Sequence, residues 1–210
     1  EINVDGKRTA LSDFARSVAG ANPPIEVVAE TVDVTSEDAV AALFSRHGSI
    51  RYLQHTAGIS PRPLTPPEAL TKEDVLGACA VNLWGAHNVL KQGIRTGAFA
   101  ARTHGVIILS TSATVGSEGG LRNLVALQAR YFLEAHGLVL NGLAPSPLRG
   151  PMAAQNPISA RRLQAVEDSM PIGALTDPSH IAAATMYFWS NECWCVGEVL
   201  TVDGGYTKHR

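Results

Sequence analysis

The sequence of 210 residues lacks the features of two large classes of protein. Its net charge is −2 and its pI is near 6.4, and no stretch of it concentrates lysine and arginine. Because a basic stripe is the electrostatic mark of nucleic-acid-binding proteins, we expect no nucleic acid as its main partner. The sequence also has no run of about eighteen apolar residues, the length that a membrane-spanning helix needs. No spanning segment is therefore expected.

Cysteine is scarce too, with three residues, Cys79, Cys193 and Cys195. No two of them form a Cys-x-x-Cys pair, and Cys193 and Cys195 are too close in sequence for an ordinary disulfide. The histidines show no metal-ligand spacing. The sequence therefore predicts reduced thiols, no metal site and a cytoplasmic location, where disulfides are rare.

The sequence does contain the alternation of strands and helices that is typical of a parallel sheet covered on both faces. With 45% hydrophobic and 17% charged residues, the chain is expected to form one globular domain over residues 1–210. The predicted class is α/β, with a doubly wound parallel sheet in three α/β/α layers. Strands are predicted over residues 25–34, 51–56, 106–111, 138–143 and 199–202, and helices over 9–18, 36 onward, 71–89 and beyond, 121–135, 158–170 and 178–190.

Small and polar residues follow two of the predicted strands. The strand at 51–56 runs into Ala57-Gly58, and the strand at 106–111 runs into Ser112. In an open parallel sheet, ligands lie at the carboxyl ends of the strands. Gly58 has no side chain to keep a flat ligand away from the backbone. This edge is therefore the predicted binding site.

These segments, in this order, resemble the short-chain dehydrogenase/reductase family. The Asn-Asn-Ala-Gly turn of the family has its counterpart in His55-Thr56-Ala57-Gly58, its helix asparagine in Asn82 and its active-site serine in Ser112. Residues 139–147, 170–173 and 197–205 resemble the closing segments of the family. The resemblance implies a Rossmann-like fold.

It also implies an oxidoreductase that transfers a hydride between a nicotinamide cofactor and a secondary alcohol or ketone, as a small alcohol dehydrogenase or a 3-oxoacyl reductase does. Ser112 would donate a hydrogen bond to the substrate oxygen, and Asn82 would hold a water molecule of the proton relay. Two alternatives remain open: Ser112 could complete a turn at the strand end, and Asn82 could make a core hydrogen bond.

The cofactor residues follow from the same resemblance. Asp33 and Val34 match the family's adenine contact, although Asp33 could also cap a turn. Glu1 would bind the ribose hydroxyls and repel a 2′-phosphate, which favours NAD over NADP. The remaining cofactor contacts implied by the family pattern are Thr56, Ala57, Gly58, Pro145 and Ser146, the last of which replaces a glycine.

Two elements of the family pattern are missing from the sequence, the opening glycine-rich turn and the Tyr-x-x-x-Lys pair. Val125 and Ala129 occupy the positions where the pair is expected, and Tyr131 is followed four residues later by Ala135. Family and domain size predict about forty further residues before Glu1 and about nine between positions 120 and 121. The alternative is a non-catalytic dinucleotide-binding scaffold that has lost the pair, with Tyr131 as a helix-packing residue.

The predicted helices at 71–89 and from 121 carry more apolar residues than one core-facing stripe needs. The surplus includes Leu83, Val89, Leu124 and Leu127. In the family, such helices pair between subunits. We therefore expect a homotetramer or homodimer, with a small alcohol or ketone as the other partner.

Overall fold

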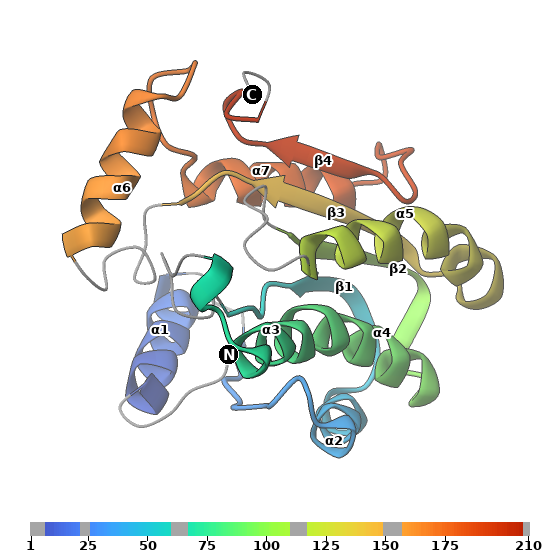
Figure 1. The fold of residues 1–210 in the computed structure, drawn as a ribbon. Helices are drawn as coiled ribbons and strands as arrows, with labels where there is room; N and C mark the ends of the chain where they lie inside the picture. Colours follow the sequence, from blue (N-terminus) through green and yellow to red (C-terminus); the bar gives the residue numbers. More distant parts are fainter. Residues whose placement is uncertain (1–6, 22–25, 60–66, 110–116, 149–156, 208–210) are drawn as a thin grey trace.

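The structure is a computed structural model that describes residues 7–21, 26–59, 67–109, 117–148 and 157–207 (Figure 1). Ser112 and Glu1 lie outside these residues. The elements are, in chain order, α1 (Lys7–Ala21), α2 (Glu37–His47), β1 (Ile50–His55), η1 (Pro67–Ala69), α3 (Lys72–Cys79), η2 (Ala80–Trp84), α4 (Gly85–Arg95), β2 (Phe99–Ile108), α5 (Ser117–His136), β3 (Val139–Pro145), α6 (Pro157–Asp168), α7 (Pro178–Trp189) and β4 (Val199–Val202).

The strands form one parallel sheet in the order β1-β2-β3-β4. Successive side chains of a strand point to opposite faces, so Ile107 packs with α4 and α5 while Val106 packs with α7. Helices therefore cover both faces, which confirms the predicted three-layer α/β class. Each strand is added on the same side of the one before it, but α7 packs on the opposite face of the sheet from α4 and α5. The crossover connection from β3 to β4 therefore has the opposite handedness from the β1–β2 and β2–β3 connections.

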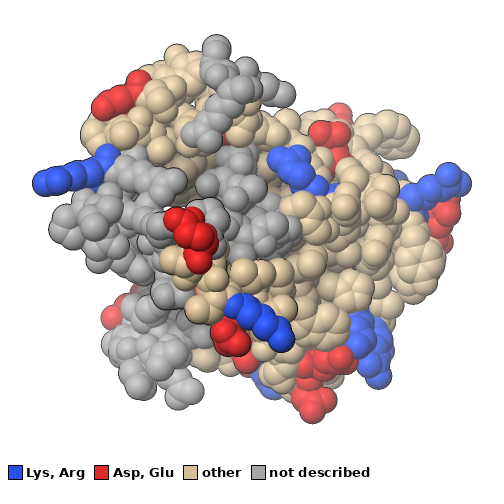
Figure 2. All heavy atoms as spheres, viewed as in Figure 1, with Lys and Arg blue, Asp and Glu red and all other residues tan. Residues whose placement is uncertain are grey.

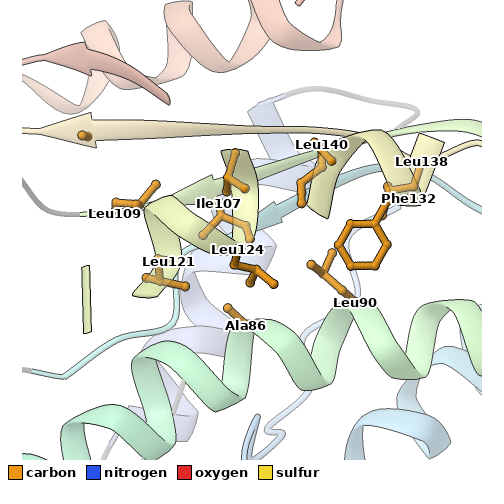
Figure 3. Packing of buried hydrophobic residues seen from close by; sticks show 12 residues of the cluster. Ala86, Leu90, Ile107, Leu109, Leu121, Leu124, Phe132, Leu138 and Leu140 are labelled. Atoms are coloured by element: carbon orange, nitrogen blue, oxygen red, sulfur yellow. The ribbon is translucent and has the colours of Figure 1, made fainter. Parts of the chain in front are cut away.

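The largest core lies between the sheet and the pair α4 and α5 (Figure 3). Ala86 and Leu90 point from α4 toward the sheet, and Ile107 and Leu140 of the central strands are fully buried beneath them. Each large side chain buried in this way stabilises the fold by about 1.5–3 kcal/mol. This layer fixes α4, and with it the segment that carries Asn82, against the sheet.

Side-chain caps start three of the helices where the sequence predicts them. Ser36 Oγ accepts from Ala39 N at 3.2 Å, and Thr71 and Asp74 form a reciprocal capping box. Asp177 Oδ1 accepts from the amide of Ser179, in the first turn of α7, at 2.8 Å. Each cap contributes about 1 kcal/mol by satisfying amides that have no partner within the helix.

The predicted strand at 25–34 is wrong for its described part, because residues 26–33 form no strand. A strand requires a neighbour for its backbone hydrogen bonds, and within the described chain β1 pairs with β2 alone. The segment is held by side chains instead. Val34 packs with Phe44, and Asn88 Nδ2 donates to the carbonyl of Val34 at 2.9 Å.

On the face drawn in Figure 2, basic and acidic side chains lie beside one another and do not gather into a patch of one sign. This arrangement agrees with the sequence, in which no basic stripe occurs. Among the described helices, none combines the length and the apolar character needed to cross a membrane.

Candidate functional site

The turn after β1 is held by the side chain of Asn82. Its Oδ1 accepts from the amide of Ile59 at 2.8 Å, and its Nδ2 donates to the carbonyl of the same residue at 3.0 Å. A Cβ on Gly58 would lie 3.4 Å from that Oδ1. The structure therefore brings together Gly58 and Asn82, two residues that are far apart in sequence and were both predicted for the site.

Asn82 occupies a π-helical turn, η2, between α3 and α4. The amide of Gly85 donates to the carbonyl of Ala80, five residues back. Such turns inside a helix occur frequently at functional sites, and asparagine is a poor former of regular helix. Gly85 also allows a close approach, since a Cβ there would lie 2.7 Å from Val34 Cγ2.

Asp33 shapes the second loop at this edge. Its Oδ1 accepts from the amide and from the hydroxyl of Thr35, each at 2.8 Å. The turn-capping alternative for Asp33 is therefore what the structure shows, while its contact with adenine stays a prediction. The neighbouring Val34 is buried, and its carbonyl faces Asn88.

A hollow of about 390 Å³ lies beside β1, and Val34, Thr56 and Ala57 all line it. Three of the predicted cofactor residues thus share one surface. Glu30 also lines this hollow, and its ion pair with Arg46 lowers the pKa of the carboxyl group. Gly58 and the end of β3 do not line this particular hollow.

His55 is a buried residue whose special position the sequence did not reveal. Its side chain is 6% exposed at the end of β1, and burial lowers its pKa to about 4. Nε2 finds no hydrogen-bond partner among the described residues. The ring is therefore neutral at physiological pH. The only sequence signal is its spacing of two from Leu53, which places both on one face of the strand.

At the end of β3, Pro145 and Ser146 are both buried. The hydroxyl of Ser146 lies 2.6 Å from that of Thr176, and Thr176 donates to the carbonyl of Val202 at 3.4 Å. Ser146 thus ties the end of β3 to the segment before α7. Its contact with a cofactor remains a prediction.

Helix α5 runs without interruption across positions 120 and 121. Val125 and Ala129, which stand where the family's pair is expected, are 0% and 1% exposed within the core. Tyr131 is 60% exposed, and its ring contacts Phe132 and His136 of its own helix. Within its described residues, α5 therefore presents no tyrosine–lysine pair to the strand ends.

An apolar groove of about 600 Å³ separates α5 from α3, η2 and the start of α4. Leu83 lines it, and Leu127 lines it with 76% of its surface exposed. Leu124 is buried at its floor, and Val89 belongs to the core. Of the four residues predicted as surplus apolar surface, Leu127 is the one that is widely exposed.

Comparison with known proteins places the chain in a family. A sequence profile described as "Enoyl-(Acyl carrier protein) reductase" matches residues 5–207. The chain is 31% identical to the cis-4-hydroxycyclohexanecarboxylate dehydrogenase of Sinomonas cyclohexanicum over 83% of this chain and 74% of that one. It is 28% identical to the galactitol 2-dehydrogenase (L-tagatose-forming) of Cereibacter sphaeroides, over 98% and 84% of the two chains.

A solved structure of a short-chain dehydrogenase/reductase of the glucose/ribitol dehydrogenase type, from Brucella melitensis, superposes with a TM-score of 0.77. It shares 24% identity and covers 95% of this chain and 82% of its own, which supports the fold. With the profile match over nearly the whole chain, these findings show that the protein belongs to the short-chain dehydrogenase/reductase family of oxidoreductases.

Proposed function

We propose that this chain transfers a hydride between NAD and the carbinol or carbonyl carbon of a small secondary alcohol or ketone. The observation that carries the proposal is the pair of hydrogen bonds between the Asn82 side chain and the backbone of Ile59, which fixes the Gly58 turn at the carboxyl end of β1. Family membership and the alcohol- and sugar-dehydrogenase relatives supply the reaction class.

The fit of a dinucleotide rests on two features of this edge. Gly58 leaves the backbone of its turn open, and Val34, Thr56 and Ala57 line the neighbouring hollow. When bound, the nicotinamide cofactor supplies or accepts the hydride. Glu1 would bind the ribose and favour NAD over NADP.

Ser112 would lie at the reacting carbon. Its hydroxyl is proposed to donate to the substrate oxygen, where negative charge develops during the reaction. Leu109, three residues earlier, donates from its amide to the carbonyl of Leu143 at 2.7 Å, so the end of β2 is fixed beside β3.

A second candidate function is a dinucleotide-binding scaffold without catalysis. The burial of Val125 and Ala129 favours it, because a tyrosine and lysine at those positions would face the core. Both candidates predict cofactor binding, and they differ in turnover.

The test measures absorbance of reduced nicotinamide with a panel of secondary alcohols and ketones. We expect turnover, slowed at least about tenfold by Ser112→Ala and unchanged by Ser45→Ala on α2. Equal rates in wild type and Ser112→Ala would contradict the role of the serine. Binding of NAD with no turnover on any substrate would favour the scaffold.

A thermal shift separates the two cofactors. NAD at a hundredfold excess over its dissociation constant stabilises the fold by about 2.7 kcal/mol, so the melting temperature should rise by several degrees. NADP should raise it less. Equal shifts would remove the argument from Glu1.

We also propose that two copies pair through the α5 groove, as a homodimer or within a homotetramer. The exposed Leu127 and Leu76 form apolar surface that a two-fold contact would bury. Light scattering should give a multiple of the monomer mass, and Leu127→Glu should reduce it. A stable monomer at micromolar concentration would reject this.

The free thiols of Cys79, Cys193 and Cys195 fit a cytoplasmic setting.

A further inference from the structure

A hollow of about 850 Å³ opens at the amino end of the sheet, opposite the edge that carries Gly58 and Asn82. Its walls come from the first residues of β1, β2 and β3 and from the loop between α7 and β4. Volumes of this order are typical of small-molecule sites. Nothing in the proposed hydride transfer uses this end of the molecule.

An irregularity in β2 shapes the hollow. The pairs Ile50–Phe99 and Tyr52–His104 flank it, so Arg51 on β1 faces residues 100–103 on β2. The buried Thr103 stabilises the extra residues, because its hydroxyl lies 2.6 Å from the carbonyl of Ile50 and 2.9 Å from that of Ala100. Bulges of this kind re-aim side chains and are common beside functional sites.

Arg102 lies within this bulge, with a φ of 62°. It is the sole described residue other than glycine with a positive φ. The left-handed region is unfavourable for a residue with a long side chain, so this conformation strains the backbone at Arg102. The surrounding bonds of Thr103 therefore hold Arg102 at the rim of the hollow against that preference.

The hollow has a positive character. Arg51 and Arg102 both line it and both are exposed, and neither has a carboxylate partner within the described part of the chain. The Arg51 guanidinium lies 5.5 Å from the centre of the Tyr52 ring. His104 also lines the hollow, and its Nδ1 donates to the carbonyl of Phe188 at 3.0 Å.

The remaining walls are apolar or aromatic. Leu133, Val139 and Val196 line the hollow, and Trp194 lines it with 91% of its surface exposed. Glu192 and Glu198 are close in sequence to Trp194 but do not line the hollow. A guanidinium pair recognises a carboxylate or phosphate, and an exposed indole offers a flat stacking surface.

We propose that this hollow is a second ligand site, which binds a small organic anion with a flat aromatic body. Arg51 and Arg102 hold the anionic group, and Trp194 covers the ring. The site is separate from the dinucleotide edge, because the two lie at opposite ends of the same strands.

Calorimetric titration with 2-naphthoate tests this on the full chain, with 2-naphthalenemethanol as the uncharged probe of the same shape. We expect one saturable site for the acid and at least about tenfold weaker binding of the alcohol, since charge-assisted hydrogen bonds are the stronger kind. Arg51→Gln and Arg102→Gln should each weaken the acid at least about fivefold. Arg46→Gln, a matched exposed arginine on α2, should not.

Arg51→Lys separates charge from geometry, because lysine keeps the charge and loses the planar fork. It should bind the acid more weakly than wild type and more tightly than Arg51→Gln. Trp194→Phe should retain most of the binding, and Trp194→Ala should not. Saturating NAD should leave the affinity for naphthoate unchanged.

Four results would overturn the proposal. They are equal binding of acid and alcohol, arginine variants that match wild type while folded by circular dichroism, competition with NAD, and no saturation at millimolar acid. One further result would also overturn it. If the wild-type protein is a dimer, and Trp194→Glu both dissociates the dimer and abolishes naphthoate binding, this face is instead an interface between copies of the chain.

Discussion

The two ends of the sheet hold their polar groups in different ways. At the carboxyl end, side chains are tied to nearby backbone: Asn82 binds Ile59, and Asp33 binds Thr35. At the amino end, Arg51 and Arg102 stand at the rim of a hollow without carboxylate partners among the described residues.

The carboxyl end of the sheet thus offers a ligand a fixed shape, whereas the amino end offers it charge. The tied groups of the carboxyl end build a fixed turn that a ligand can approach closely, which suits a reaction that needs precise placement. The arginines of the amino end offer charge that is not already neutralised, which suits recognition of an anion. Variants at one end should therefore leave the other end's binding intact.

The largest expected effect concerns the histidines at the two ends of the sheet, which differ in their surroundings. His55 at the carboxyl end is buried with a pKa of about 4, while His104 at the amino end is bonded to a backbone carbonyl. Below pH 6.5 the unfolded chain protonates at His55 and the folded chain does not, so stability should fall between pH 6.5 and about 4. The full loss from this one group is about 3 kcal/mol.

His55→Leu should remove most of that acid dependence in urea unfolding measured across the pH range. His136→Gln, at an exposed histidine of α5, serves as the control and should leave the slope as in wild type. A slope that is the same in wild type and His55→Leu would mean that another group titrates in this interval.

A variant in the bulge of β2 tests whether the two ends of the sheet are independent. Thr103→Val keeps the shape of the side chain but leaves the carbonyls of Ile50 and Ala100 without their donor. We expect a loss of about 1–3 kcal/mol in the free energy of unfolding, together with weaker naphthoate binding and unchanged NAD binding.

Thr96→Val at the end of α4 is the matched control, since Thr96 is exposed and the carbonyl of Gln92, to which its hydroxyl donates, also accepts from the amide of Thr96. It should cost no more than about 0.5 kcal/mol. If Thr103→Val changed NAD affinity as much as naphthoate affinity, the two ends would not be independent.

Asn82→Ala has a smaller effect on stability and a specific effect on binding. Ile59 is exposed, so water replaces the two lost hydrogen bonds at a cost of about 1 kcal/mol. The freed turn should weaken NAD about tenfold in calorimetry and leave naphthoate unaffected. Asn82→Asp should fall between, because a carboxylate accepts from the amide of Ile59 but cannot donate to its carbonyl. Wild-type affinity in Asn82→Ala would refute the role of the clamp.

Local chemistry made much of this molecule predictable from its sequence. The helices capped by Ser36 and Thr71 begin where the sequence predicts them, and β4 has the predicted bounds, 199–202. The family pattern assigned Gly58 and Asn82 to the site separately, and the structure shows that they lie beside each other.

Long-range pairing was less predictable. β2 begins at Phe99, seven residues before the apolar run at 106, because pairing with β1 and the bonds of Thr103 define a strand that its own polar residues do not indicate. The hollow with Arg51 and Arg102 arises only from that register. Similarly, the burial of His55 is indicated in the sequence by nothing more than its spacing of two from Leu53.

The central claim is that the Gly58 turn receives the dinucleotide, and Gly58→Val tests it most directly. The added Cβ would lie 3.4 Å from Asn82 Oδ1, so the fold has room for it, and the rest of the branched side chain would stand where the cofactor approaches. Calorimetric titration with NAD should show saturable binding to wild type and at least about tenfold weaker binding to Gly58→Val, with naphthoate affinity and melting temperature nearly unchanged. Equal NAD affinities in the two proteins, or no NAD binding to wild type, would contradict the assignment.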